Sequence, residues 1–292
     1  MTQETMTPPN TPQRARPLVY LRRLAAIVCV VYLVLCAAFY FLQDQIIFPG
    51  KATQGRADAV VAEAPTTRLI RLNLADGTPI VARYDLAARV DPAAAPTVLV
   101  FYGNGQCART TGGVIYIFQQ LGCNVLTPDY PGYGMSGGVP SEASLFAAAD
   151  TCWKYLQSRT DIDHSQLHIV GWSLGSGVAI DLAARVRPRS LTTISAYTSM
   201  ADMGRHTAPF LPVSLILRHP FRSIDKIAQV QCPILLIHGQ RDTTIPPEMS
   251  RTLAARATSP VTTLYQPYSD HNDIFDTDAD PLIAALARHL GR

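Results

Sequence analysis

Residues 166–182 read QLHIVGWSLGSGVAIDL, and this stretch predicts a strand, a sharp turn and a helix in immediate succession. The apolar run 167–170 is typical of a buried strand, and residues 178–182 begin a helical spacing. Between them, the pattern G-x-S-x-G is centred on Ser173. Glycines on both sides remove side chains that would collide with the neighbouring strand and helix. The turn should therefore hold the Ser173 hydroxyl clear of the sheet, at a helix N-terminus that stabilises negative charge.

The same pattern occurs a second time around Ser136, as Gly-Met-Ser-Gly-Gly at residues 134–138. Its surroundings differ, because the turn-forming run PDYPGY at residues 128–133 precedes it and no helix starts directly behind it. We therefore interpret Ser136 as a loop residue. Ser173 has the strand, turn and helix of a nucleophile elbow and is the candidate nucleophile.

The chain has 292 residues, enough for one large domain with an appendage. An apolar content of 48% with 16% charged residues excludes a disordered chain. Residues 1–43 hold four of the 25 basic side chains and one of the 22 acidic ones, which leaves 21 of each sign in the remainder. The net charge of +3 therefore lies in the N-terminal segment, and nothing in the charge favours a nucleic-acid partner.

Residues 24–42, LAAIVCVVYLVLCAAFYFL, form an uncharged run long enough to cross a bilayer as a helix. Arg22 and Arg23 directly precede it and should stay on the cytoplasmic side. We expect a cytoplasmic polar tail at 1–23, a transmembrane anchor at 24–42, and a single domain at 43–292 outside the cytoplasm, which would be the periplasm if the organism is a bacterium. A cleaved signal peptide is the rival interpretation, although the run is longer than the usual signal core. A buried core helix is the third.

Downstream of the anchor, strands alternate with helices. Strands are predicted at residues 67–74, 79–86, 97–101, 123–127, 167–170, 191–197, 233–237 and 262–266, and helices at 114–121, 141–158, 244–257 and 281–290 besides the one after Ser173. The first two strands flank Asp76 and Gly77, which is a hairpin signal. The pattern predicts an α/β fold with a mostly parallel eight-stranded sheet and helices on both faces.

A further segment lies between the strands at 191–197 and 233–237. Residues 208–217, APFLPVSLIL, are apolar and interrupted by prolines. We expect a small lid within about residues 199–231, and a helix that simply packs on the sheet is the alternative.

A serine hydroxyl is a weak nucleophile at neutral pH, so Ser173 needs a histidine that accepts its proton and a carboxylate that orients the histidine. In nucleophile-elbow enzymes the acid and then the histidine follow the serine along the chain. Asp242 follows the seventh predicted strand and His271 follows the eighth, at the edge of the sheet where Ser173 emerges. Asp270 and Asp273 also neighbour His271, but residues so close in sequence seldom reach its ring correctly. Asp242 is therefore the preferred acid.

An oxyanion hole requires two backbone N–H donors. Leu174, directly after the nucleophile, should supply one. The loop Gly-Asn-Gly-Gln at residues 103–106 should supply the other, with Asn104 as the donor. An ordinary flexible loop is the alternative for this segment.

The six cysteines do not have the spacing of a zinc site, and neither a metal nor another cofactor is expected. Two lie in the anchor. The others are Cys107, Cys123, Cys152 and Cys232. A disulfide among them is an alternative if the domain is extracytoplasmic, but three of the four adjoin predicted core elements, which favours buried free thiols.

From residue 45 onward the chain resembles the membrane-anchored α/β-hydrolases related to the eukaryotic acyl-protein depalmitoylases and to bacterial serine hydrolases. The resemblance rests on IIFP at 46–49, FYGNG at 101–105, DYPGYGMS at 129–136, GWSLG at 171–175, YTS at 197–199, HGQRD at 238–242 and HND at 271–273. It implies the α/β-hydrolase fold, with His238 and Asp129 in structural roles. Tyr102 and Asp270 depart from the histidine and glycine usual at those places, so the packing of the oxyanion loop and the surroundings of His271 should differ.

These residues predict a serine hydrolase acting on carboxylic esters or thioesters. An aminopeptidase-like enzyme and a catalytically silent binding protein are the alternatives. The short connection from the anchor to the first strand keeps the domain near the membrane surface. We therefore expect medium to long acyl substrates that enter past residues 210–217.

Overall fold

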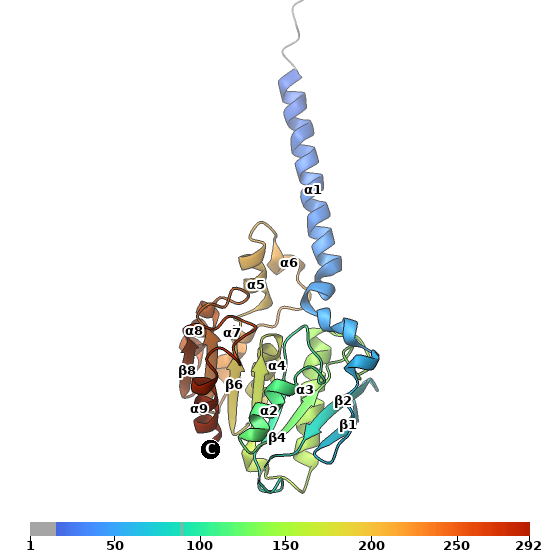
Figure 1. Ribbon diagram of the computed structural model, residues 1–292. Coiled ribbons are helices and arrows are strands. Elements are labelled where there is room, and N and C mark those ends of the chain that lie inside the picture. Colours follow the sequence, from blue (N-terminus) through green and yellow to red (C-terminus); the bar gives the residue numbers. More distant parts are fainter. Residues whose placement is uncertain (1–15, 89) are drawn as a thin grey trace, which may run out of the picture. The chain divides into compact units, whose positions relative to one another are not determined.

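The computed structural model describes residues 16–88 and 90–292, so residues 1–15 of the expected tail lie outside the described part (Figure 1). Residues 43–292 form one compact unit around an eight-stranded sheet. Its strands are β1 (Thr67–Asn73), β2 (Pro79–Asp85), β3 (Thr97–Phe101), β4 (Asn124–Pro128), β5 (Leu167–Trp172), β6 (Ser190–Ile194), β7 (Ile234–Gly239) and β8 (Val261–Gln266). The order across the sheet is β1-β2-β4-β3-β5-β6-β7-β8. Only β1–β2 and β2–β4 pair antiparallel, which confirms the predicted mostly parallel sheet.

Helices cover both faces of this sheet. The longer ones are α2 (Gly112–Gln120), α3 (Glu142–Ser158), α4 (Leu174–Arg185), α8 (Pro247–Arg256) and α9 (Ala279–Leu290). Apolar side chains of α3, α4 and α8 pack into the cluster on one face, and those of α2 and α9 into the cluster on the other. The predicted two-sided α/β architecture is therefore confirmed.

The predicted strand at 191–197 is too long. β6 ends at Ile194 because Ser195 adopts a φ of 49°, a left-handed conformation that cannot continue a strand. The chain turns away from the sheet at this point, close to the elbow. The strand pattern alone gave no sign of this turn, because the next two residues, Ala196 and Tyr197, are as apolar and buried as those of a strand.

The N-terminal unit, residues 1–42, contributes most of helix α1 (Arg16–Ile47). By length and composition the span Leu18–Ile47 is able to cross a membrane, and none of its most apolar window is buried within the structure. These exposed side chains do not suit a buried core helix. A signal sequence shares the same features, so the choice between anchor and signal, and the orientation, stay predictions.

Residues 43 and 44, near the end of α1, contact the region predicted as the lid. The buried Gln43 side chain donates from Nε2 to the carbonyl of Ile216 (3.1 Å) and accepts from the backbone N–H of Arg218 (2.7 Å). Asp44 accepts from the Arg218 guanidinium (2.6 Å) and lies 3.1 Å from Nε2 of His219. The NH2 group and the oxygen of the Gln43 amide thus both bind the backbone of residues 216–218.

Residues 199–231 divide into two parts. The first contains α5 (Met200–Thr207) and α6 (Val213–Ile216), and it exposes 63% of Phe210 and 86% of Leu215. The second contains α7 (Ser223–Lys226) and the 3-10 turn η4 (Ile227–Gln229), which pack against α4. Phe221, Ile227 and Val230 are buried there in the core. The second part thus packs on the core, as the alternative describes, and a lid stays a prediction for the residues before about 218.

Three further 3-10 turns complete the described elements: η1 (Pro49–Thr53), η2 (Ala57–Ala59) and η3 (His164–Gln166). The four cysteines of the domain are free and buried, as favoured from the sequence. Burial raises the pKa of Cys123 to about 11 and that of Cys152 to about 12. These thiols therefore stay protonated and unreactive near neutral pH.

Close packing of α4 on the sheet yields a first prediction. A Cβ on Gly175 would lie 2.1 Å from the carbonyl oxygen of Phe101, a backbone atom that cannot move aside cheaply. We expect Gly175→Ala to lower the free energy of unfolding by more than about 2 kcal/mol in urea titrations of the detergent-solubilised protein. Gly113→Ala is the matched control, because no atom lies within 4 Å of its added Cβ in helix α2. That control should leave stability unchanged or raise it by up to about 1 kcal/mol. Equal effects of the two changes would contradict this account of the elbow.

Candidate active site

Ser173 occupies the sharp turn between β5 and α4. Its φ of 52° and ψ of −120° lie outside the conformations that most residues adopt, and its N–H donates to the carbonyl of Ile194 on β6 (2.9 Å). A Cβ on Gly171 would lie 2.4 Å from the carbonyl oxygen of Gly175. At both glycines of the pattern a side chain would therefore collide with backbone atoms. The backbone between them is strained, as expected for a nucleophile elbow.

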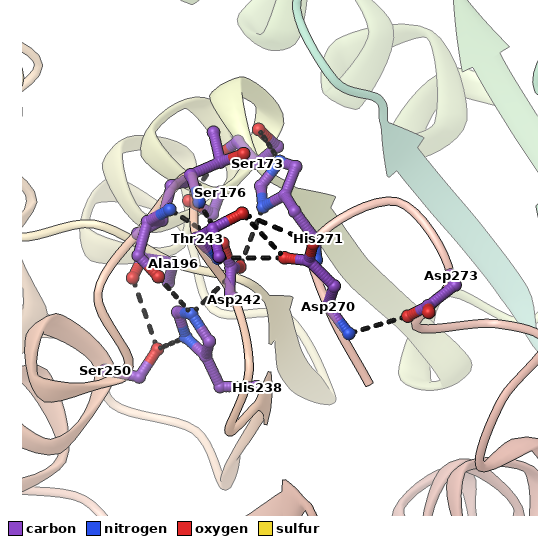
Figure 2. Close-up of polar contacts among 12 residues, drawn as sticks. Ser173, Ser176, Ala196, His238, Asp242, Thr243, Ser250, Asp270, His271 and Asp273 are labelled. Carbon is purple, nitrogen blue, oxygen red and sulfur yellow. Dashed lines mark hydrogen bonds and ion pairs between the residues drawn. The ribbon is translucent and has the colours of Figure 1, made fainter. Parts of the chain in front are cut away.

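Three residues from separate loops meet at this turn (Figure 2). Nε2 of His271 lies 2.9 Å from Oγ of Ser173, and Nδ1 of the same ring lies 2.8 Å from Oδ2 of Asp242. Ser173, Asp242 and His271 each expose between 7% and 8% of their surface. The structure therefore brings together all three residues that the sequence proposed as nucleophile, acid and base.

The carboxylate of Asp242 is held in its ionised form. Burial by itself would raise its pKa, but hydrogen bonds from His238 and His271 and from backbone N–H groups outweigh burial and lower the pKa far below its usual range. Oδ1 accepts from the N–H of Thr244 (2.9 Å) and of Ile245 (2.7 Å). An ionised carboxylate can only accept, so it fixes the proton of His271 on Nδ1. Nε2 is then free to accept the proton of the Ser173 hydroxyl.

His238 is a second histidine that contacts the Asp242 carboxylate. Its Nε2 lies 2.9 Å from the carbonyl of Ile245 and 3.2 Å from Oδ2 of Asp242, so Nε2 carries a proton. Nδ1 of His238 lies 2.6 Å from Oγ of Ser250. The imidazole is fully buried and does not reach Ser173, in keeping with the structural role that the resemblance implied.

Asp270 does not replace Asp242. Its carboxylate accepts from the backbone N–H groups of Thr243 (2.8 Å) and His271 (2.7 Å), and it holds the loop rather than the imidazole ring. Asp273 accepts from the backbone N–H of Asp270 (2.7 Å). The aspartate that stands where glycine is usual therefore joins the loops after β7 and β8.

The predicted oxyanion donors border the nucleophile. Leu174 is the first residue of α4, so its N–H has no acceptor within the helix. Across the turn, a Cβ on Gly103 would lie only 3.5 Å from Cβ of Ser173, which places the loop after β3 directly beside the serine. The N–H of Asn104 belongs to this loop. Tyr102, which stands where histidine is usual, donates from its hydroxyl to Oδ1 of the buried Asp129 (3.0 Å).

Ser136 lies apart from these residues. Its hydroxyl donates to the carbonyl of Asp129 (2.7 Å) and accepts from the N–H of Val81 (2.9 Å). The second copy of the pattern is thus a buried structural turn. Among residues 16–88 and 90–292, no group of three His, Cys, Asp or Glu side chains is arranged to hold a metal ion.

One neighbour of the histidine was missed from the sequence. The Trp172 ring lies 6.3 Å from the His271 ring at an angle of 30°, and it packs edge-on against Phe275. Trp172 occupies the first variable position of G-x-S-x-G, and an aromatic residue beside a candidate nucleophile was the available signal.

The chain has relatives among known proteins. A family model of the α/β-hydrolase fold matches residues 96–215. The chain is 31% identical over 272 residues to an uncharacterized protein of Mycobacterium tuberculosis, covering 92% of this chain and 95% of that protein. It is 32% identical over 187 residues to the human α/β hydrolase domain-containing protein 17B, covering 64% of each chain.

Solved structures share the fold. An esterase of Pyrococcus furiosus superimposes with a TM-score of 0.66 at 18% identity, over 80% of this chain and 94% of that one. An acetyl xylan esterase from Paenibacillus gives a TM-score of 0.63 at 17% identity, over 79% of this chain and 86% of that one. The sheet order, the sequence relatives and these structures lead to one conclusion: the chain belongs to the α/β-hydrolase family.

Proposed function

We propose that the protein is a serine hydrolase that cleaves carboxylic ester or thioester bonds through an acyl-enzyme intermediate. The observation that carries this proposal is the unbroken line of contacts from Ser173 through His271 to an ionised Asp242. A catalytically silent relative needs no such arrangement, and its buried polar groups would only cost stability.

The geometry supports a two-step reaction. His271 Nε2 takes the proton of Ser173 as Oγ attacks the substrate carbonyl, and the N–H groups of Asn104 and Leu174 receive the oxyanion. The protonated His271 then gives its proton to the departing alcohol or thiol, which leaves the acyl group on Ser173. A water molecule, deprotonated by His271, attacks this ester. His271 then returns the proton to Oγ of Ser173 as the carboxylic acid is released.

The substrate class follows from the position of the domain along the chain. Helix α1 ends at Ile47, and Gln43 and Asp44 bind the residues next to α6 directly. Phe210 and Leu215 expose most of their apolar side chains in this region. We propose medium to long acyl or lipid-like substrates that enter there, and a domain on the extracytoplasmic side.

The first test concerns the nucleophile. Ser173→Ala should abolish ester turnover and labelling by a fluorophosphonate probe, a loss of roughly 10⁶-fold in kcat, because no other group can form the acyl-enzyme. Ser136→Ala is the control, and it should lower the melting temperature through its two lost hydrogen bonds while the folded protein keeps its kcat. Silence of Ser136→Ala together with activity of Ser173→Ala would refute the assignment.

A membrane-impermeant probe added to intact cells should label Ser173 if the domain is extracytoplasmic.

The second test concerns the acid. Asp242→Asn should lower kcat by about 10⁴-fold, because a neutral amide leaves the wrong proton on His271. Asp270→Asn keeps the loop oxygen and should cost less than about 10-fold. Since the pKa of Asp242 is lowered in the folded protein, its charge is lost only in strong acid, and the pH–rate profile between about pH 5 and 8 should show no inflection from it. A mild Asp242→Asn with a severe Asp270→Asn would reassign the acid.

The third test concerns acyl length. Each buried methylene contributes about 0.8 kcal/mol, so kcat/KM for p-nitrophenyl esters should rise with chain length beyond acetate. Leu215→Ser should flatten this rise. Val139→Ser is the matched control, because Val139 is 74% exposed but lies outside the lid region. A steady decline from acetate onward that neither change affects would leave a hydrolase of small esters.

A further inference from the structure

The carbonyl groups of the loop beside Ser173 are held by two tyrosines. The hydroxyl of Tyr130 donates to the carbonyl of Tyr102 (2.8 Å), and the hydroxyl of Tyr133 donates to the carbonyl of Asn104 (3.0 Å). The backbone N–H of Gly50 donates to the same Asn104 carbonyl (2.9 Å). Both tyrosines belong to the DYPGYG run of the sequence, which so far has no part in the proposed reaction.

These bonds hold the two peptide groups that flank the one carrying the Asn104 N–H. A trans peptide group is planar, so its N–H points opposite to its carbonyl. The Gly103–Asn104 peptide lies between the two peptides whose carbonyls the tyrosines hold. Within it, the Gly103 carbonyl accepts from the N–H of Gln106 (3.4 Å). The Asn104 N–H therefore points to the other side of the loop, and no described residue accepts from it.

The two tyrosines are well suited to hold a backbone. Tyr130 and Tyr133 are fully buried, and their rings contact each other edge-on with centroids 5.5 Å apart. Burial raises the pKa of both phenols, so both remain protonated donors at any pH the protein survives. A buried hydroxyl without its acceptor would be costly, and this cost keeps each tyrosine on its carbonyl.

Gly50 brings the segment after the anchor into the same contact. A Cβ at this position would lie 2.1 Å from the Tyr133 ring and 2.7 Å from the Asn104 carbonyl oxygen. Gly50 is the third residue after the end of α1, and Phe48, two residues before it, is fully buried. The chain that leaves the membrane helix thus packs against the tyrosine and the loop at once.

We propose that Tyr130 and Tyr133, with the N–H of Gly50, are positioning residues that aim the Asn104 N–H at the oxyanion of the transition state. The inference rests on the proposed function, because it assumes that Ser173 attacks a carbonyl. None of these groups touches the substrate. Loss of a tyrosine hydroxyl should therefore lower kcat through a misdirected donor and leave substrate binding in place.

The test compares an ester with its thiono analogue in full-length protein. Sulfur is a weaker hydrogen-bond acceptor than oxygen, so a thionoester profits less from an oxyanion hole. The substrates are p-nitrophenyl butanoate and the compound with C=S in place of C=O. The variants are Tyr130→Phe and Tyr133→Phe, which keep the rings. Tyr155→Phe is the matched control, because its hydroxyl accepts from Arg159 on the distant end of α3.

We expect each loop variant to lower kcat for the ester by about 10-fold, part of the ~10²–10³-fold loss caused by removing an oxyanion donor outright. KM and the thionoester rate should change by less than about threefold, so the preference for the ester falls. Tyr155→Phe should leave the preference unchanged. Equal losses on both substrates, or an ester kcat within about twofold of wild type, would overturn the inference.

Two controls keep the outcome decisive. Circular dichroism at the assay temperature identifies folded variants, and because the two hydroxyls hold different carbonyls, one folded variant suffices for the comparison. Ser173→Ala separates the inference from the proposed function. If that variant still hydrolyses the ester, the proposed function fails. If it is inert and the ester preference survives in both loop variants, only the positioning role fails.

Discussion

The close contact between α4 and the carboxyl ends of the central strands is the constraint on which the site depends. Gly175 packs directly on the Phe101 carbonyl, and Gly171 packs on α4. Any larger residue would push the helix away and relax the turn that strains Ser173. Because β3 and β5 are adjacent and parallel, the same contact brings the loop after β3 beside the serine. Ser173 and the predicted oxyanion donors are thus placed by one packing interface.

The ionised carboxylate of Asp242 determines the arrangement around His271. Asp242 is buried, and burial alone would favour its neutral form. Two histidines and two backbone N–H groups compensate for the lost water, so the carboxylate stays ionised and sets the tautomer of His271. This arrangement costs stability unless every partner is present, since a buried charge without its donors is strongly unfavourable. His238 therefore helps to stabilise the Asp242 carboxylate without contacting Ser173.

Residues 43–50 contact two separate parts of the domain. Gln43 and Asp44 hold the backbone next to α6, and Gly50 holds the loop beside Ser173. A stretch of about eight residues thus contacts two of the elements that border the proposed site. The same short stretch thus supports both the residues next to α6, where a lid is predicted, and the loop after β3.

The alternation of strands and helices, the elbow around Ser173 and the chain order of Ser173, Asp242 and His271 can be predicted from sequence, because each depends on local spacing and on the rule that parallel strands end at one edge. The tertiary structure decided what depends on distances between loops. Asp242 rather than Asp270 contacts the imidazole of His271, because the Asp270 carboxylate accepts hydrogen bonds from backbone N–H groups instead. Phe221 and Ile227, which lie within the segment predicted as a lid, are buried in the core instead. The hydroxyls of Tyr130 and Tyr133 reach the carbonyls of Tyr102 and Asn104 only because β4 lies next to β3, a neighbour relation that no local pattern contains.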